Sequence, residues 1–131
     1  MPSAWALTAP ELIGTARTEV RVSTLRFLSD WSQKQIGDVR PGTPLRIEYD
    51  GERLPQCRSE RYGQPAWNIA AYLRFHPGGE TQSGVVSRNP FDVDVPANAT
   101  RIELWFHNTD QTGCSAWDSN YGQNYWVDIT P

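Results

Sequence analysis

Short segments of alternating apolar and polar residues recur along this chain, and they constrain its fold more than any other feature. In the longest, Trp67, Ile69, Ala71, Leu73 and Phe75 occupy every second position. The side chains of a β-strand point alternately to its two faces, so this pattern is typical of a strand with one buried and one exposed face.

Six further segments have the character of strands, and turn-forming residues separate them: residues 19–28, 45–49, 84–87, 91–95, 102–107 and 124–130. A break in phase at Ser23-Thr24 predicts a β-bulge in the first of them. Residues 9–16 have room for a helical turn or two. The pattern predicts an all-β fold, an antiparallel β-sandwich of about seven or eight strands. We expect one domain over residues 1–131.

The charge balance argues against nucleic acid as a partner. Twelve basic residues face fifteen acidic ones, the net charge is −3, and the arginines are spread along the chain. No apolar run is long enough to span a membrane. Residues 1–13 lack the basic start and long apolar centre of a signal peptide. This indicates either a protein that stays inside the cell or a chain whose leader has been removed.

Cys57 and Cys114 are the only cysteines, and both lie in polar, turn-like stretches. We predict a disulfide that joins two loops, and the alternative is a pair of free thiols. A disulfide implies an oxidising compartment and a secreted or cell-surface protein, whereas the missing signal peptide argues the other way.

The segment 116–129 carries two Trp, two Tyr, two Asn and two Asp around a single Gly. Its second half alternates: Tyr125, Val127 and Ile129 point one way, and the residues between them point the other. Gly122 is expected to supply a positive φ angle. Flat rings beside amide and carboxylate groups are what a protein uses to grip a sugar, because rings stack on the apolar face of the sugar and polar groups bond its hydroxyls.

We therefore predict a carbohydrate site near the C-terminus, formed by Trp117, Asp118, Asn120, Tyr121, Asn124 and Trp126. The alternative is a rigid turn, in which Asp118 and Asn120 satisfy backbone amides and Trp117 plugs the end of the sandwich. Trp105 is a further candidate platform, whereas Trp67 shares the apolar phase and is expected in the core.

This stretch resembles the signature Trp-Asp-Asn-Asn-x-Gly-x-Asn-Tyr of carbohydrate-binding module family 21, which binds starch and glycogen. The matching residues are Trp117, Asp118, Asn120, Gly122, Asn124 and Tyr125, while Ser119 departs from the signature. The resemblance covers about a tenth of the chain and implies a β-sandwich with a glucan ligand.

The whole chain is more similar to a set of uncharacterised bacterial domains. The shared features are Tyr-Asp-x-x-Arg-Leu-Pro-x-Cys-Arg (residues 49–58), Gly-x-Pro-Ala-Trp (63–67) and Gly-Cys…Asp-Ser-Asn-Tyr-Gly-x-Asn-Tyr (113–125). This resemblance supports a Cys57–Cys114 bridge and implies no particular activity.

Two other groups of residues carry charge. Arg53, Arg58 and Arg61 crowd one segment, where they either bind an anion or pair with acidic residues across the loops; the candidates are Glu52, Glu60, Asp110 and Asp118. In the second interpretation, which we favour, Arg58 anchors Asp118. Asp110, Asp118 and Asn120, with Asp50, are loop residues that could hold calcium, although no regular ladder of calcium ligands is present.

Catalysis is the weakest interpretation. His76 and His107 belong to no recognisable catalytic or metal-binding pattern. We expect a non-catalytic module, free of cofactors unless calcium binds, that takes a polysaccharide or oligosaccharide at the loops 57–62 and 114–125. The alternative is a protein-interaction or assembly module, in which the same aromatic patch contacts a partner chain or a second copy.

Overall fold

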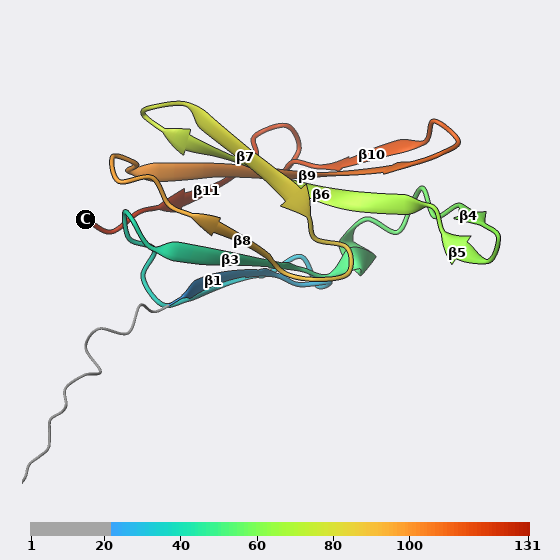
Figure 1. Cartoon of the computed structure of the whole chain (residues 1–131), viewed down its shortest axis with the longest axis horizontal. Coiled ribbons are helices and arrows are strands. Elements are labelled where there is room, and N and C mark those ends of the chain that lie inside the picture. The colour runs from blue at the N-terminus through green and yellow to red at the C-terminus, as the bar shows by residue number, and fades with distance from the viewer. Residues whose placement is uncertain (1–21) are drawn as a thin grey trace, which may run out of the picture.

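The computed structural model describes residues 22–131, which form two β-sheets packed face to face and a small hairpin (Figure 1). In order across the four-stranded sheet lie β2 (Gln33–Ile36), β1 (Ser23–Phe27), β3 (Pro44–Tyr49) and β8 (Phe91–Asp94). The five-stranded sheet holds β10 (Ser115–Asp118), β9 (Arg101–Asp110), β6 (Trp67–His76) and β7 (Glu80–Val85), with β11 (Tyr125–Asp128) also paired to β9. The hairpin of β4 (Glu60–Arg61) and β5 (Gln64–Pro65) lies at one end of the sandwich.

The predicted all-β sandwich is confirmed, and its core is built by the expected alternation. Along β6 the side chains of Ile69, Ala71, Leu73 and Phe75 are buried between the sheets. Strand pairing is antiparallel except between β1 and β3, which run parallel. One 3-10 turn, η3 (Gly51–Arg53), follows β3, and Asp50 caps it by accepting a hydrogen bond from the Glu52 amide.

Several strands differ from the expectation. Of the strand expected at residues 84–87, only residues 84 and 85 are in a strand, where they end the longer strand β7. The strands β2, β4, β5 and β10 were not expected at all. The bulge expected at Ser23-Thr24 is wrong, because the register between β1 and β3 is continuous from Ser23 to Phe27. The helical turn expected at residues 9–16, and the start of the strand expected at 19–28, lie outside the described residues.

β9 carries two short partners on the same side, and this arrangement positions the C-terminal loop. β11 pairs with residues 101–104 of β9, and β10 pairs with residues 106–109. The loop 119–124 therefore leaves and rejoins the sheet at the middle of β9. It turns sharply through left-handed backbone at Asn120, Tyr121, Gly122 and Asn124, so the positive φ angle expected at Gly122 is confirmed.

The predicted disulfide between Cys57 and Cys114 is present, with 5.3 Å between the two Cα atoms. It joins the segment before β4 to the turn between β9 and β10, so the two loop regions meet as predicted. Within residues 22–131, no helix has the length and apolar character needed to cross a membrane.

Removing the disulfide should lower the free energy of unfolding by about 4 kcal/mol, because the bridge restricts the unfolded chain by closing a loop between residues 57 positions apart. Urea denaturation of a Cys57→Ala, Cys114→Ala double variant against the native protein measures this loss. An unchanged free energy of unfolding would show that the loops are held together by their other contacts alone.

Candidate functional site

A buried ion pair between Arg53 and Asp118 joins the two sheets. Their side chains are 0% and 1% exposed, and Nε of Arg53 lies 3.0 Å from Oδ2 of Asp118. The hydroxyl of Tyr49 donates to Oδ2 at 2.7 Å, and that of Tyr125 donates to Oδ1 at 2.6 Å. Arg53 also donates to the Tyr125 hydroxyl at 2.8 Å and to the carbonyl oxygen of Leu28 at 2.9 Å. Both charges are therefore compensated by opposite charge and by hydrogen bonds.

Burial has a large effect on the ionisation of the groups around this pair. Burial and the hydrogen bond to Asp118 raise the pKa of Tyr125 to about 12, and the same causes raise the pKa of Tyr49 further. Burial acts to lower the pKa of Arg53, but the hydrogen bond and the charge of Asp118 outweigh it and hold that pKa above its usual value. The tyrosines thus stay neutral and the arginine stays charged over the physiological range.

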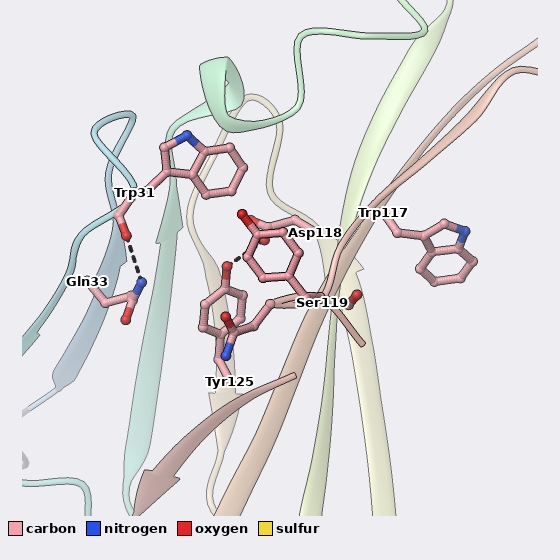
Figure 2. A pocket seen from close by; sticks show the side chains of 8 residues that line it. Trp31, Gln33, Trp117, Asp118, Ser119 and Tyr125 are labelled. Atoms are coloured by element: carbon pink, nitrogen blue, oxygen red, sulfur yellow. Dashed lines mark hydrogen bonds between the residues drawn. The ribbon is translucent and has the colours of Figure 1, made fainter. Parts of the chain in front are cut away.

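An open pocket of about 380 Å³ lies above the ion pair, between the turn joining β1 to β2 and the segment 117–125 of the other sheet (Figure 2). It is lined by Trp31, Gln33, Trp117, Asp118, Ser119, Asn120, Tyr121 and Tyr125. Trp31 is 56% exposed, and Tyr121 is fully exposed. The guanidinium carbon of Arg53 lies 4.6 Å from the centre of the Trp31 ring, so Trp31 covers the ion pair from the solvent side.

The polar groups of the pocket are partly used by the loop itself. The Asn120 side-chain amide donates to the carbonyl oxygen of Asn124 at 3.3 Å, and the Ser119 hydroxyl accepts from the Gly122 amide at 3.1 Å. Gln33 donates one amide hydrogen to the carbonyl oxygen of Trp31 at 3.0 Å. None of the described residues bonds the side-chain carbonyl oxygens of Gln33 and Asn120, so both oxygens can accept a further hydrogen bond.

The six residues predicted as one site lie on two faces of the five-stranded sheet. Asp118, Asn120 and Tyr121 border the pocket. Trp117 borders it too, but its ring stacks on His107 on the outer face, with 3.7 Å between ring centres, and points away from Asp118 (Figure 2). This separation follows from strand alternation, because Trp117 and Asp118 are neighbours in β10.

Trp126 and Asn124 also belong to the outer face. Trp126 stacks on His76 at 5.2 Å, and Asn124 donates to Glu103 at 2.7 Å. Burial acts to raise the pKa of Glu103, but hydrogen bonds from His76 and Asn124 and the charge of Arg74 hold it below its usual value. Asn124 thus has a partner within the fold.

The further aromatic residues lie in the expected positions. Trp67 packs partly buried against the core, where the guanidinium groups of Arg58 and Arg88 lie over its ring at 4.0 and 5.0 Å. Trp105 lies on the opposite face and stacks on Tyr72. Trp31, in contrast, was missed together with Gln33, and the signal that could have found it is the turn sequence Asp30-Trp31-Ser32, which exposes a large ring.

Arginine does pair with acid across these loops, but through a different residue than expected. Arg53 pairs with Asp118, so the expected Arg58–Asp118 contact is wrong. Arg58 instead donates to the carbonyl oxygens of Gly51 and Leu54, because it lies beside η3 and over the ring of Trp67. Arg61 is exposed in β4.

The calcium candidates Asp110, Asp118 and Asn120 do not converge. Asp110 caps the turn after β9 by accepting hydrogen bonds from Thr112 and Cys114, which hold its pKa below the usual value. Asp118 is committed to Arg53. In the part of the chain that the structure describes, no group of three or more His, Cys, Asp or Glu side chains is placed to hold a metal ion.

Fold and site together define a disulfide-bridged β-sandwich with an open aromatic pocket on one edge. The chain belongs to the family of unknown function DUF6209, which matches residues 15–130. Nothing in the comparisons supports the similarity to carbohydrate-binding module family 21. No curated protein and no solved structure matches the chain.

Replacing Arg53 with Met should lower the free energy of unfolding by about 3–5 kcal/mol, because Asp118 would be left buried without its charge partner. Arg46→Met is the matched control, since the Arg46–Asp92 pair is 42% and 53% exposed and its loss should cost at most about 1 kcal/mol. Urea denaturation measures both. Equal losses in the two variants would contradict a special role for the buried pair.

Stability should also fall at alkaline pH. A group whose pKa is higher in the folded state contributes stability that is complete below its unfolded value and is lost as the pH rises through the folded value. For Tyr125 this window runs from 10.0 to about 12. Tyr125→Phe has no hydroxyl to ionise, so its unfolding free energy should fall less steeply with pH across this window. Equal slopes in chemical denaturation would contradict this account.

Proposed function

We propose that the protein is a non-catalytic binding module and that the pocket takes a carbohydrate. One observation carries the proposal. Two exposed rings, Trp31 from the β1–β2 turn and Tyr121 from the C-terminal loop, border one pocket whose charges are already paired. Exposed rings beside uncharged hydrogen-bonding groups suit a ligand with apolar faces and many hydroxyls.

The state of the pocket floor favours a neutral ligand. Asp118 and Arg53 compensate each other, and the hydroxyl of Tyr125 is fixed between them by one donated and one accepted hydrogen bond. Among residues 22–131, those that line the pocket therefore leave no unpaired charge for a charged ligand. In this proposal Trp31 and Tyr121 stack on sugar rings, and the amide oxygens of Gln33 and Asn120 bond hydroxyls.

Asp118 takes a different part from the one predicted for it. Both of its oxygens accept hydrogen bonds from buried donors. In this proposal Asp118 therefore positions Tyr125, and other pocket residues make the direct contacts with the sugar. The C-terminal resemblance to starch- and glycogen-binding modules makes α-glucans the first ligands to test. Each stacking ring contributes about 1 kcal/mol, so a single site would bind modestly and gain from several copies on one polysaccharide.

Self-association is the second candidate function, and the edge strand β2 favours it. All four residues of β2 are exposed, and its outer edge pairs with no other strand among the described residues. A free strand edge can pair with the same edge of a second copy.

Tyr121→Ala should weaken glucan binding about fivefold, because a stacking contact of about 1 kcal/mol is lost. Calorimetric titration with soluble starch, glycogen and other soluble polysaccharides, with and without calcium, measures it. Tyr62→Ala is the matched control, since both tyrosines are exposed and both have left-handed backbone, at φ angles of 54° and 57°, but Tyr62 lies in the β4–β5 turn.

The proposal is wrong if no polysaccharide binds, or if the two variants weaken binding equally. Sedimentation of the protein without ligand measures its oligomeric state and so tests self-association, the second candidate function. An association that rises with protein concentration and disappears in Gln35→Pro, where proline disrupts β2, would favour self-association.

A further inference from the structure

A second cavity of about 240 Å³ lies between β2 and β11, and it is lined by Leu25, Phe27, Gln33, Lys34, Gln35, Tyr125, Trp126 and Val127. Gln33 and Tyr125 border both cavities. The two cavities therefore adjoin along the open edge of the sandwich, where β2 belongs to one sheet and β11 to the other.

Alternation along β2 places two side-chain amides on one wall of the second cavity. Gln33 and Gln35 pair with Phe27 and Leu25, whose side chains are buried in the core, so both glutamines point to the inner side of the strand. Strand geometry separates them by roughly 7 Å. Trp31 comes two residues before Gln33, so a ring and two amides follow one another along the wall.

The opposite wall and the floor are largely apolar. Tyr125 and Val127 of β11 are half-buried and pack against the core, and they face the same interior as Leu25 and Phe27. The Gln35 amide is held by its hydrogen bond to the carbonyl oxygen of Gly37 at 3.1 Å. It keeps a carbonyl oxygen that is not bonded by any residue from 22 to 131. The two adjoining cavities thus offer apolar surface with hydrogen-bonding groups at regular intervals. Lys34 also borders the second cavity, but it pairs with Arg26, so its side chain points to the outer side of β2.

The space formed by the two cavities is closed at the end that lies farther from Trp31. Beyond β2 and β11 the two walls are joined, because the Thr130 amide donates to the carbonyl oxygen of Val39 at 2.7 Å and Arg40 donates to that of Pro131 at 2.9 Å. In the part of the chain that the structure describes, the walls therefore lie apart from the region of Trp31 and Tyr121 to that of Gln35 and Val127. The space for a ligand is correspondingly limited in length.

We infer that the two cavities form one groove that binds a linear, uncharged oligosaccharide lengthwise, with sugar rings at Trp31 and Tyr121 and following units along Gln33 and Gln35. The inference rests on the proposed function and adds the form of its ligand. A linear glycan presents apolar ring faces and hydroxyls repeatedly along its length, which matches the repeated pattern of the groove. The closed end implies that affinity stops rising once the groove is filled.

The test is a calorimetric titration with glucose, maltose, maltotriose and longer malto-oligosaccharides, and with the matching cello-oligosaccharides. In the series that binds, affinity should rise at least about tenfold from the single sugar to the longer chains and then level off. Gln35→Ala should weaken binding of the long chains about threefold to tenfold and leave the shortest ligand unaffected. Ile36→Ala, on the other face of the same strand, is the control and should change neither.

Equal affinity for all chain lengths, with Tyr121→Ala still weakening binding, would overturn the lengthwise groove and leave the proposed function standing. An unchanged dependence on chain length in Gln35→Ala would overturn it as well. If long chains are lost in Gln35→Pro but kept in Gln35→Ala, the backbone edge of β2 is the binding element and the inference is wrong. Failure of every saccharide to bind would remove the proposed function together with the groove.

Discussion

The ion pair between Arg53 and Asp118 is buried where the two sheets meet, and placing two charges there has a large desolvation cost. Hydrogen bonds offset this cost together with the attraction between the charges. The hydroxyls of Tyr49 and Tyr125 donate to Asp118, and the carbonyl oxygen of Leu28 accepts from Arg53. These partners come from β3, β11 and the segment after β1. The pair can therefore form only when both sheets and the turns between them are in place, which links local geometry to the whole fold.

The pocket is a direct product of this arrangement. Asp118 fixes Tyr125, and Arg53 supports the ring of Trp31 from below, so two of the pocket's aromatic residues are held by the same pair of charges. A ring whose lower face is fixed loses little conformational entropy when a ligand stacks on its exposed part. The two charges thus shape the pocket through the rings they hold in place.

Much of the fold could be predicted because it depends on alternation. β3, β6, β8, β9 and β11 each place apolar residues at every second position, as residues 45–49 in β3 and 67–75 in β6 illustrate. β2 could not be found in this way, because Gln33-Lys34-Gln35-Ile36 is exposed throughout and has no apolar face. Its position depends on pairing with β1, which is a tertiary effect.

The candidate site was only partly predictable for a related reason. The motif lies in a segment that borders the pocket, but β10 was not expected, and without it the opposite directions of Trp117 and Asp118 could not be known. Arg53 and Trp31 are far from the motif in sequence and reach it only through sheet packing. A linear motif shows which residues are unusual, whereas the division between buried support and exposed contact depends on the paired strands.

Because β10 and β11 pair end to end with β9, the loop between them can change without disturbing the sheet. Residues 119–124 bridge the gap between β10 and β11 without forming part of either, and the ladders on both sides anchor them firmly. Insertions or exchanges there would leave the hydrogen bonding of the sheet intact. The framework therefore tolerates a different loop at this point without a change of fold.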